Sequence, residues 1–138
     1  MADLVRTGLS LERELLTRFD RLIARRGYQN RSKAIRDVIR DRIVEDETSE
    51  NKIVAGTLTM IYDHHRPNLA EKLIKVQHHA GSKVLAATHV HLSRDYCLEV
   101  VIMKGRSGDL RRLGDQILSL RGVKHGRLVI TSTGKSLR

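Results

Sequence analysis

Two consecutive segments near the start of the chain carry hydrophobic residues at helical spacing. The first apolar stripe comprises Leu15, Leu16, Phe19, Leu22 and Ile23, and the second comprises Ala34, Ile35, Val38, Ile39 and Ile43. Such stripes are typical of amphipathic helices that bury one face. Gly27 is placed to end the first helix. Asn30 or Ser32 can cap the second.

The residues before these helices alternate with period two, which predicts a short strand over 4–11. On that strand Arg6, Gly8 and Ser10 share one face, and Ser10 can also cap the first helix. A lone strand leaves both of its edges unpaired, and about 45 residues form too small a core to be stable alone. We therefore expect a dimer in which this strand pairs with its twin.

The rest of the chain alternates strand and helix signals in the order βαββαβ. The expected strands are 53–62, 83–92, 97–104 and 123–132, and the expected helices are 67–80 and 107–120. This order is typical of a ferredoxin-like sandwich with the helices on one face of the sheet. The fold class is thus α+β. We divide the chain into a domain at 1–47, a polar linker at 48–52, a second domain at 53–134 and a tail at 135–138.

The charge of the chain favours a polyanionic partner. Lys and Arg number 26 against 16 Asp and Glu, so the formal net charge is +10 and the isoelectric point is near 10.4. Aromatic residues make up only 3%, which disfavours single-stranded or RNA ligands that stack bases on rings. Double-stranded DNA remains, and a two-stranded ribbon fits its major groove.

Three absences in the sequence restrict the setting. No run approaches the roughly 20 apolar residues of a membrane span, and the N-terminus shows no basic-then-apolar signal pattern. The single cysteine, Cys97, excludes an internal disulfide framework. We therefore expect a cytoplasmic protein with no membrane association.

One cluster of residues predicts a metal site. His89 and His91 lie two apart on an expected strand, so both imidazoles share a face. Cys97 follows a three-residue turn and opens the antiparallel neighbour, within cross-strand reach. Two imidazoles and a thiolate suit Ni(II), Cu(II), Co(II) and Zn(II). A fourth ligand, His78 or His79, could come from the same chain or from a partner.

Other interpretations of these residues are simpler. A lone cysteine is often a small buried hydrophobe. A nucleophilic Cys–His pair would need an orienting acid or amide, and none is evident from the spacing. His64 and His65 fall at a strand end, where we expect solvated side chains, with an auxiliary metal contact as the lesser alternative.

At these residues the sequence resembles the nickel-responsive transcriptional regulators of bacteria and archaea. The resemblance covers roughly residues 4–132. Four segments carry the resemblance, in the same order along the chain. They are 26–37 (RGYQNRSKAIRD), 77–79 (QHH), 89–99 (which begins HVH and ends with Cys97, Leu98 and Glu99) and 121–126 (RGVKHG).

The resemblance implies a homotetramer, with an ACT-type core and a ribbon-helix-helix DNA-binding dimer at each end. It implies one square-planar Ni(II) per chain, bound by His89, His91 and Cys97, with His78 supplied by a neighbouring chain. His79 is excluded because the ligand directly follows Gln77. Gln77 and Glu99 are expected to support the ligands.

The resemblance also assigns the DNA-reading residues. Arg6, Gly8 and Ser10 would face the major groove, where Arg6 can contact guanine with two hydrogen bonds and Gly8 reads no base. The start of the second helix, at Asn30, Arg31 and Ser32, would hold phosphate. The implied activity is not enzymatic. It is nickel-dependent operator binding, which represses nickel-uptake genes.

One position departs from the family. An auxiliary cation site there often uses two acids one helical turn apart. Asp37 keeps one of these positions, but Lys33 occupies the other. The ammonium group of Lys33 could replace the positive charge of the auxiliary cation.

Two other classes of function remain open. One is an antitoxin-type ribbon-helix-helix protein whose second half binds a toxin. The other is a regulator of the same architecture that responds to another transition metal or to a small-molecule effector in the ACT-like domain. Fold analogy alone does not choose among them.

Overall fold

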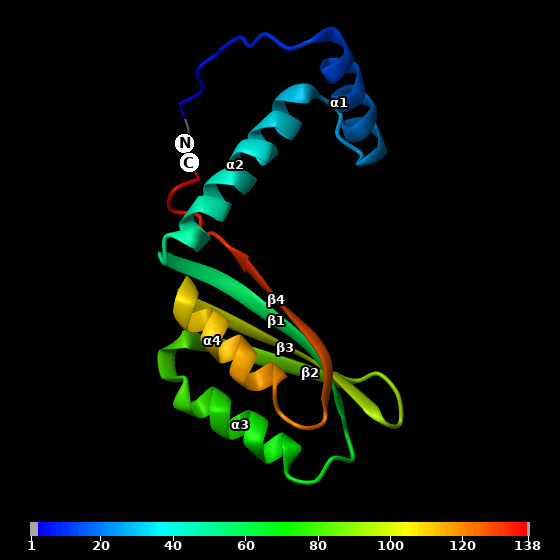
Figure 1. The fold of residues 1–138 in the computed structure, drawn as a ribbon, viewed down its shortest axis with the longest axis vertical. Helices are drawn as coiled ribbons and strands as arrows, with labels where there is room; N and C mark the ends of the chain where they lie inside the picture. Colours follow the sequence, from blue (N-terminus) through cyan, green and yellow to red (C-terminus); the bar gives the residue numbers. More distant parts are fainter. Residues whose placement is uncertain (1–2, 138) are drawn as a thin grey trace. The chain divides into compact units, whose positions relative to one another are not determined.

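The computed structural model describes residues 3–137, and these divide into two compact units at the boundary between Ile43 and Val44. The N-terminal unit contains α1 (Arg13–Arg25) and most of α2 (Arg31–Ser49). The other unit contains the end of α2 and the residues that follow as far as Ser136 (Figure 1). Residues 1 and 2 of the predicted first domain and Arg138 of the predicted tail lie outside the described residues.

The turn between α1 and α2 forms as the sequence predicts. Gly27 adopts a left-handed backbone (φ 81°) directly after α1. The side chain of Asn30 then accepts a 2.9 Å hydrogen bond from the N–H of Lys33 and caps α2. A two-pronged contact between Arg31 and Asp20 (2.9 and 2.8 Å) joins the helices. This contact holds the pKa of the Asp20 carboxyl below its ordinary value.

The predicted strand at 4–11 is not a strand in the single chain. Residues 3–12 carry no regular structure and are exposed. A strand needs a hydrogen-bonding neighbour, and within the described residues nothing pairs with this segment. In this unit the described residues bury only Ile23 and Ala34. Its apolar side chains are therefore left without a core of their own.

The predicted linker at 48–52 is partly helical. Helix α2 continues through the acidic residues to Ser49. Glu is a good helix former, so a polar, acidic composition does not by itself end a helix. The stop comes at Asn51, which adopts a left-handed backbone (φ 55°).

The second unit has the predicted βαββαβ order. Its elements are β1 (Ile53–Asp63), α3 (Leu69–His79), a short 3-10 turn (Gly81–Lys83), β2 (Val84–His91), β3 (Tyr96–Arg106), α4 (Ser107–Leu118) and β4 (Val123–Thr131). The strands pair antiparallel in the order β2-β3-β1-β4. Helix α3 starts at Leu69 rather than at Pro67, because Asn68 has a left-handed backbone (φ 64°).

One face of the sheet forms the core. Even-numbered residues of β1 and odd-numbered residues of β3 are buried against Leu69 and Leu73 of α3 and Leu110, Leu113 and Ile117 of α4. The opposite face carries apolar side chains that remain exposed, among them Ile102 and Val129, which flank Thr57 of β1. Within residues 3–137, none of the helices is both long and apolar enough to cross a lipid bilayer.

Candidate metal centre and DNA-reading segment

The candidate metal centre lies where β2, β3 and the end of β1 meet. Antiparallel pairing sets His91 of β2 opposite Cys97 of β3, and β1 sets Tyr62 on the other side of Cys97. The turn between β2 and β3 is closed by the N–H of Leu92, which donates to the carbonyl of Tyr96 (2.9 Å). The sequence predicted that His91 and Cys97 lie opposite each other on two strands joined by a short turn, and the structure confirms this arrangement.

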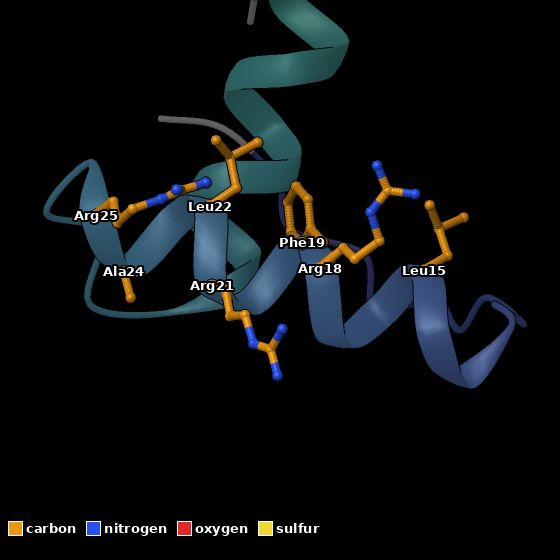
Figure 2. A pocket seen from close by; sticks show the side chains of 7 residues that line it. All are labelled: Leu15, Arg18, Phe19, Arg21, Leu22, Ala24 and Arg25. Carbon is orange, nitrogen blue, oxygen red and sulfur yellow. The ribbon is translucent and has the colours of Figure 1, made fainter.

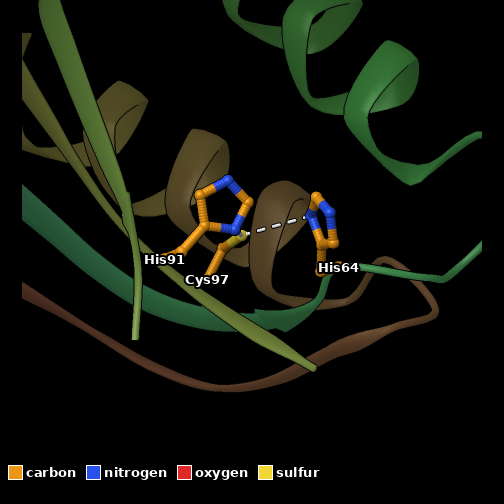
Figure 3. A group of neighbouring side chains, drawn as sticks. All are labelled: His64, His91 and Cys97. Carbon is orange, nitrogen blue, oxygen red and sulfur yellow. Dashed lines mark hydrogen bonds between the residues drawn. The ribbon is translucent and has the colours of Figure 1, made fainter. Parts of the chain in front are cut away.

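Three side chains converge there. The Cys97 sulfur lies 3.5 Å from His91 Nδ1 and 3.5 Å from His64 Nδ1. The ligand atoms of all three lie within 4.8 Å of one another. Figure 3 shows His91 and Cys97 on adjacent strands and His64 on the segment after β1, with its ring facing the sulfur. Cys97 is buried while the imidazoles are exposed.

His64 is exposed, as the sequence predicts, and its ring also lies beside Cys97. Its backbone N–H donates to the carbonyl of Asp95 (2.8 Å), which ties the segment after β1 to the β2–β3 turn. His65 strengthens this tie, since its Nε2 lies 3.1 Å from the carbonyl of Arg94 and 3.3 Å from an Asp95 oxygen. The register of β1 against β3 decides this proximity, and alternation along a strand does not reveal register.

His89 lies beside this group without belonging to it. It shares the face of His91, with ring centroids 6.1 Å apart, and pairs with Glu99 of β3. It lines a cavity of about 310 Å³ together with His64, Gln77, Cys97 and Glu99. His89 and Cys97 therefore border the same cavity.

A helix and a strand are joined across this cavity. Gln77 Nε2 of α3 donates a 2.6 Å hydrogen bond to Glu99 Oε2, and Glu99 is only 8% exposed. The next residue, His78, is exposed in the last turn of α3. Among the described residues His78 is outside the convergent group, so one chain alone does not bring it to Cys97.

Tyr62 also lines the cavity. Burial and the nearby Glu99 carboxylate and Cys97 raise the pKa of its phenol to about 12. The ring is therefore neutral in ordinary buffers. It adds an apolar wall beside the sulfur.

The donor set fits a borderline transition metal. Thiolate and imidazole are the ligands that Ni(II), Cu(II), Co(II) and Zn(II) share. A buried sulfur with two imidazole nitrogens at 3.5 Å needs little rearrangement to hold one ion. The hard cations Mg²⁺ and Ca²⁺ prefer oxygen ligands and fit poorly.

The residues predicted to read DNA lie in the N-terminal unit. Arg6, Gly8 and Ser10 all fall in the exposed segment before α1. At the start of α2, the Asn30 side chain is engaged in capping and the Arg31 guanidinium in the contact with Asp20. Ser32 is exposed beside them.

Asp37 already has partners for both carboxylate oxygens. Lys33 Nζ donates to one oxygen and the Tyr28 hydroxyl donates to the other, each at 2.7 Å. The hydrogen bond from Lys33 and then that from Tyr28 hold the pKa of the Asp37 carboxyl below its ordinary value. The ammonium of Lys33 thus supplies a positive charge at the predicted auxiliary cation position.

An apolar groove runs along α1. Figure 2 shows Leu15, Phe19 and Leu22 projecting from one side of the helix and Arg21 from the other. Leu15 and Leu22 are 49% and 40% exposed. A stripe of this width is normally covered in a stable protein.

Two family models match the chain. The family model described as the NikR C terminal nickel binding domain matches residues 55–131. The model of ribbon-helix-helix proteins of the copG family matches residues 5–46.

Relatives match along nearly their whole length. A protein of Solibacter usitatus is 49% identical over all of both chains. One of Trichlorobacter lovleyi is 48% identical over 96% of each chain. One of Thermococcus kodakarensis is 47% identical over 97% of this chain and 98% of its own. The names of all three describe nickel-responsive regulators.

Proposed function

Because the chain belongs to the family of nickel-responsive ribbon-helix-helix regulators, we propose that it represses nickel-uptake genes by binding their operators more tightly when Ni(II) is bound. The convergence of Cys97 with His91 at the β2–β3 turn is the observation that carries this proposal. It supplies a soft, buried donor beside an imidazole, which is what a nickel sensor needs. The family consists of DNA-binding regulators rather than enzymes.

We propose that His89, His91 and Cys97 of one chain bind the metal together with His78 of a neighbouring copy, at one Ni(II) per chain. The shared strand face of His89 and His91 supports the first part. The exposed position of His78 at the end of α3 supports the second, because an exposed side chain can reach another molecule. When bound, the metal supplies a bond between two chains.

The residues around the ligands hold them in place. The Gln77–Glu99 hydrogen bond attaches the end of α3 to the centre of β3. Because Gln77 directly precedes His78, this bond also restrains the position of His78. The hydrogen bond from His64 to Asp95 fixes the segment that borders the cavity. Partners of this kind orient ligands and raise metal affinity.

For the N-terminal unit we propose that the segment 4–11 pairs with its twin and presents Arg6, Gly8 and Ser10 to the major groove. The start of α2, at Asn30, Arg31 and Ser32, would contact phosphate through its backbone N–H groups. The net charge of +10 supports a DNA partner. Such a regulator would act in the cytoplasm, where the operator DNA is.

We also propose that the assembly is a homotetramer. The apolar groove of α1 offers one surface for a second copy. The exposed apolar sheet face with Ile102 and Val129 offers another. Two separate exposed apolar surfaces suit a dimer of dimers, in which each surface would pair with its own copy.

A metal titration with DNA binding as readout tests the proposal. Ni(II) should produce an intense thiolate-to-metal band that saturates at one metal per chain and is absent in Cys97→Ala, while His79→Ala, the matched control, should behave as wild type. Ni(II) should also raise the affinity for DNA selected from a random pool. If Ni(II) leaves DNA binding unchanged, the proposed function is wrong.

The same titration separates the nearest alternative. Cu(II), Co(II) and Zn(II) can use the same donors, and the Irving–Williams order makes affinity alone uninformative. A regulator of another metal would show its increase in DNA affinity with that ion and not with Ni(II). A regulator of a small-molecule effector would show it with none of them.

A further inference from the structure

Helix α2 ends at a joint that hydrogen bonds hold closed. The N–H of Lys52 donates to the carbonyl of Glu47 (3.3 Å) across the helix end, and the N–H of Glu50 donates to Asp46 (3.0 Å). Between them Asn51 takes the left-handed backbone (φ 55°) that such a helix end requires. Asparagine tolerates this conformation better than most residues.

The side chain of Asn51 has a second partner far away in the sequence. Its Oδ1 accepts a 2.8 Å hydrogen bond from the N–H of Gly108, in the first turn of α4. The residue that precedes α4, Arg106, makes no side-chain capping bond of its own. Asn51 therefore ends one helix and caps another that begins 56 residues later.

Three more hydrogen bonds join the same two segments. Ser107 Oγ donates to the carbonyl of Thr48 (2.8 Å), and the N–H of Ser107 donates to the carbonyl of Lys52 (3.0 Å). Arg106 Nη1 donates to the carbonyl of Asn51 (3.3 Å). Ser107 is 1% exposed, so its bond to Thr48 is shielded from water. The Ser107 hydroxyl thus bonds to α2 and not to the first turn of α4.

Helix α4 connects this joint to the core of the metal-binding unit. Its Leu110, Leu113 and Ile117 belong to the same buried cluster as Cys97 and Leu73. A shift of the cluster therefore acts on the N-terminal end of α4, to which the end of α2 is attached.

We propose that these contacts form a latch, consisting of Thr48, Asn51 and Lys52 on one side and Arg106, Ser107 and Gly108 on the other. The latch sets the direction in which α2 leaves the metal-binding unit. Motion between the two units then occurs within α2, N-terminal to Thr48, and not in the segment 48–52. The proposal rests on the proposed function only where it says that nickel-dependent DNA binding needs a closed latch.

Limited proteolysis of the full-length protein tests the structural part. Trypsin can cut after Lys52 only if the joint opens, because the Lys52 carbonyl and N–H are both bonded. Asn51→Gly keeps the left-handed backbone but removes the bond to Gly108. One lost hydrogen bond should speed cleavage after Lys52 about fivefold or more. Asn51→Asp, which keeps an acceptor oxygen, is the matched control, and trypsin should cleave it after Lys52 at the wild-type rate.

DNA binding tests the functional part, with Ser107→Ala as a second, independent variant. Both variants should keep the wild-type thiolate-to-metal band and stoichiometry, which shows that they fold and bind nickel. The factor by which Ni(II) raises affinity for the duplex selected by the wild-type protein should fall about fivefold or more.

The outcomes separate the two proposals. If the wild-type protein does not respond to Ni(II), the proposed function fails, and the proteolysis still decides whether the latch is closed. If the wild type responds, variants that are cleaved faster yet respond fully overturn the functional role of the latch. Variants that are cleaved at the wild-type rate overturn the latch itself.

Discussion

Gln77 and Glu99 are joined by a 2.6 Å hydrogen bond that links the end of α3 to the centre of β3. The contact lies one residue before His78 and opposite His89 in the β2–β3 register. A single side-chain pair thus joins α3 and β3, two of the three elements that carry the proposed ligands.

Replacing Gln77 with Ala should weaken nickel binding without abolishing it. Alanine is compatible with a helix, but its side chain no longer holds the buried Glu99 carboxylate in place. The loss of a hydrogen bond that supports metal ligands typically lowers metal affinity about 10–100-fold. Competition with a chelator of known affinity measures the change. Glu71→Ala, on the exposed side of the same helix, should leave affinity unchanged. Equal affinities for all three proteins would show that the pair does not support the site.

Replacing His64 and His89 separately should identify the ligand set. With His89, His91 and Cys97 as ligands, His89→Ala should lower affinity by more than the roughly 100-fold upper range of a supporting residue, and His64→Ala by much less. The thiolate-to-metal band and competition with a chelator measure nickel binding by each of the two variants. The opposite ranking would mean that the convergent group of His64, His91 and Cys97 holds the metal.

Tyr62 should stay protonated well above the range of an ordinary tyrosine. Its pKa is raised to about 12, against about 10 in an unfolded chain. Below pH 10 both states are neutral. From about pH 10 to 12 only the unfolded state ionises, so this residue lowers the free energy of unfolding as pH rises.

An ultraviolet difference titration measures the Tyr62 ionisation, and Tyr62→Phe should remove the highest step. Chemical denaturation at about pH 9 and 11 should show a smaller loss of stability in Tyr62→Phe than in wild type. A wild-type step near 10 for all tyrosines would contradict the buried environment.

Replacing Arg6 with Lys should separate base reading from charge. Lysine keeps the positive charge but loses the planar two-bond contact with guanine. Affinity for the selected duplex should fall by about 1–3 kcal/mol, with nonspecific DNA and the salt dependence little changed. A loss that is equal for selected and nonspecific DNA would place Arg6 on phosphate instead.

Replacing Ile102 with Asp should dissociate the proposed tetramer. The side chain is 42% exposed on the open sheet face, so the charge costs the single chain little but is costly in an apolar interface. Light scattering after size-exclusion chromatography should show a smaller species with unchanged circular dichroism. Gln116→Asp, exposed on α4 on the other side of the sheet, is the control for the added charge. An intact tetramer in Ile102→Asp would exclude this face as the interface.

Sequence alone determined what local periodicity controls. The βαββαβ order follows from apolar spacing, and the meeting of His91 with Cys97 follows from alternation across a short turn. The C-terminal end of α1 and the cap of α2 follow from Gly27 and Asn30, because backbone preference and capping act within a few residues. The start of α1 was predicted wrongly, since the helix begins after Glu12 and not after Ser10.

Tertiary structure decided the contacts between distant segments. His64 reaches Cys97 because β1 pairs with β3 in one register among several that the same alternation permits. Helix α2 ends just before Asn51, whose side chain accepts a hydrogen bond from Gly108 of α4. Such contacts depend on how packed elements meet in space, and residue spacing within each element does not encode that meeting.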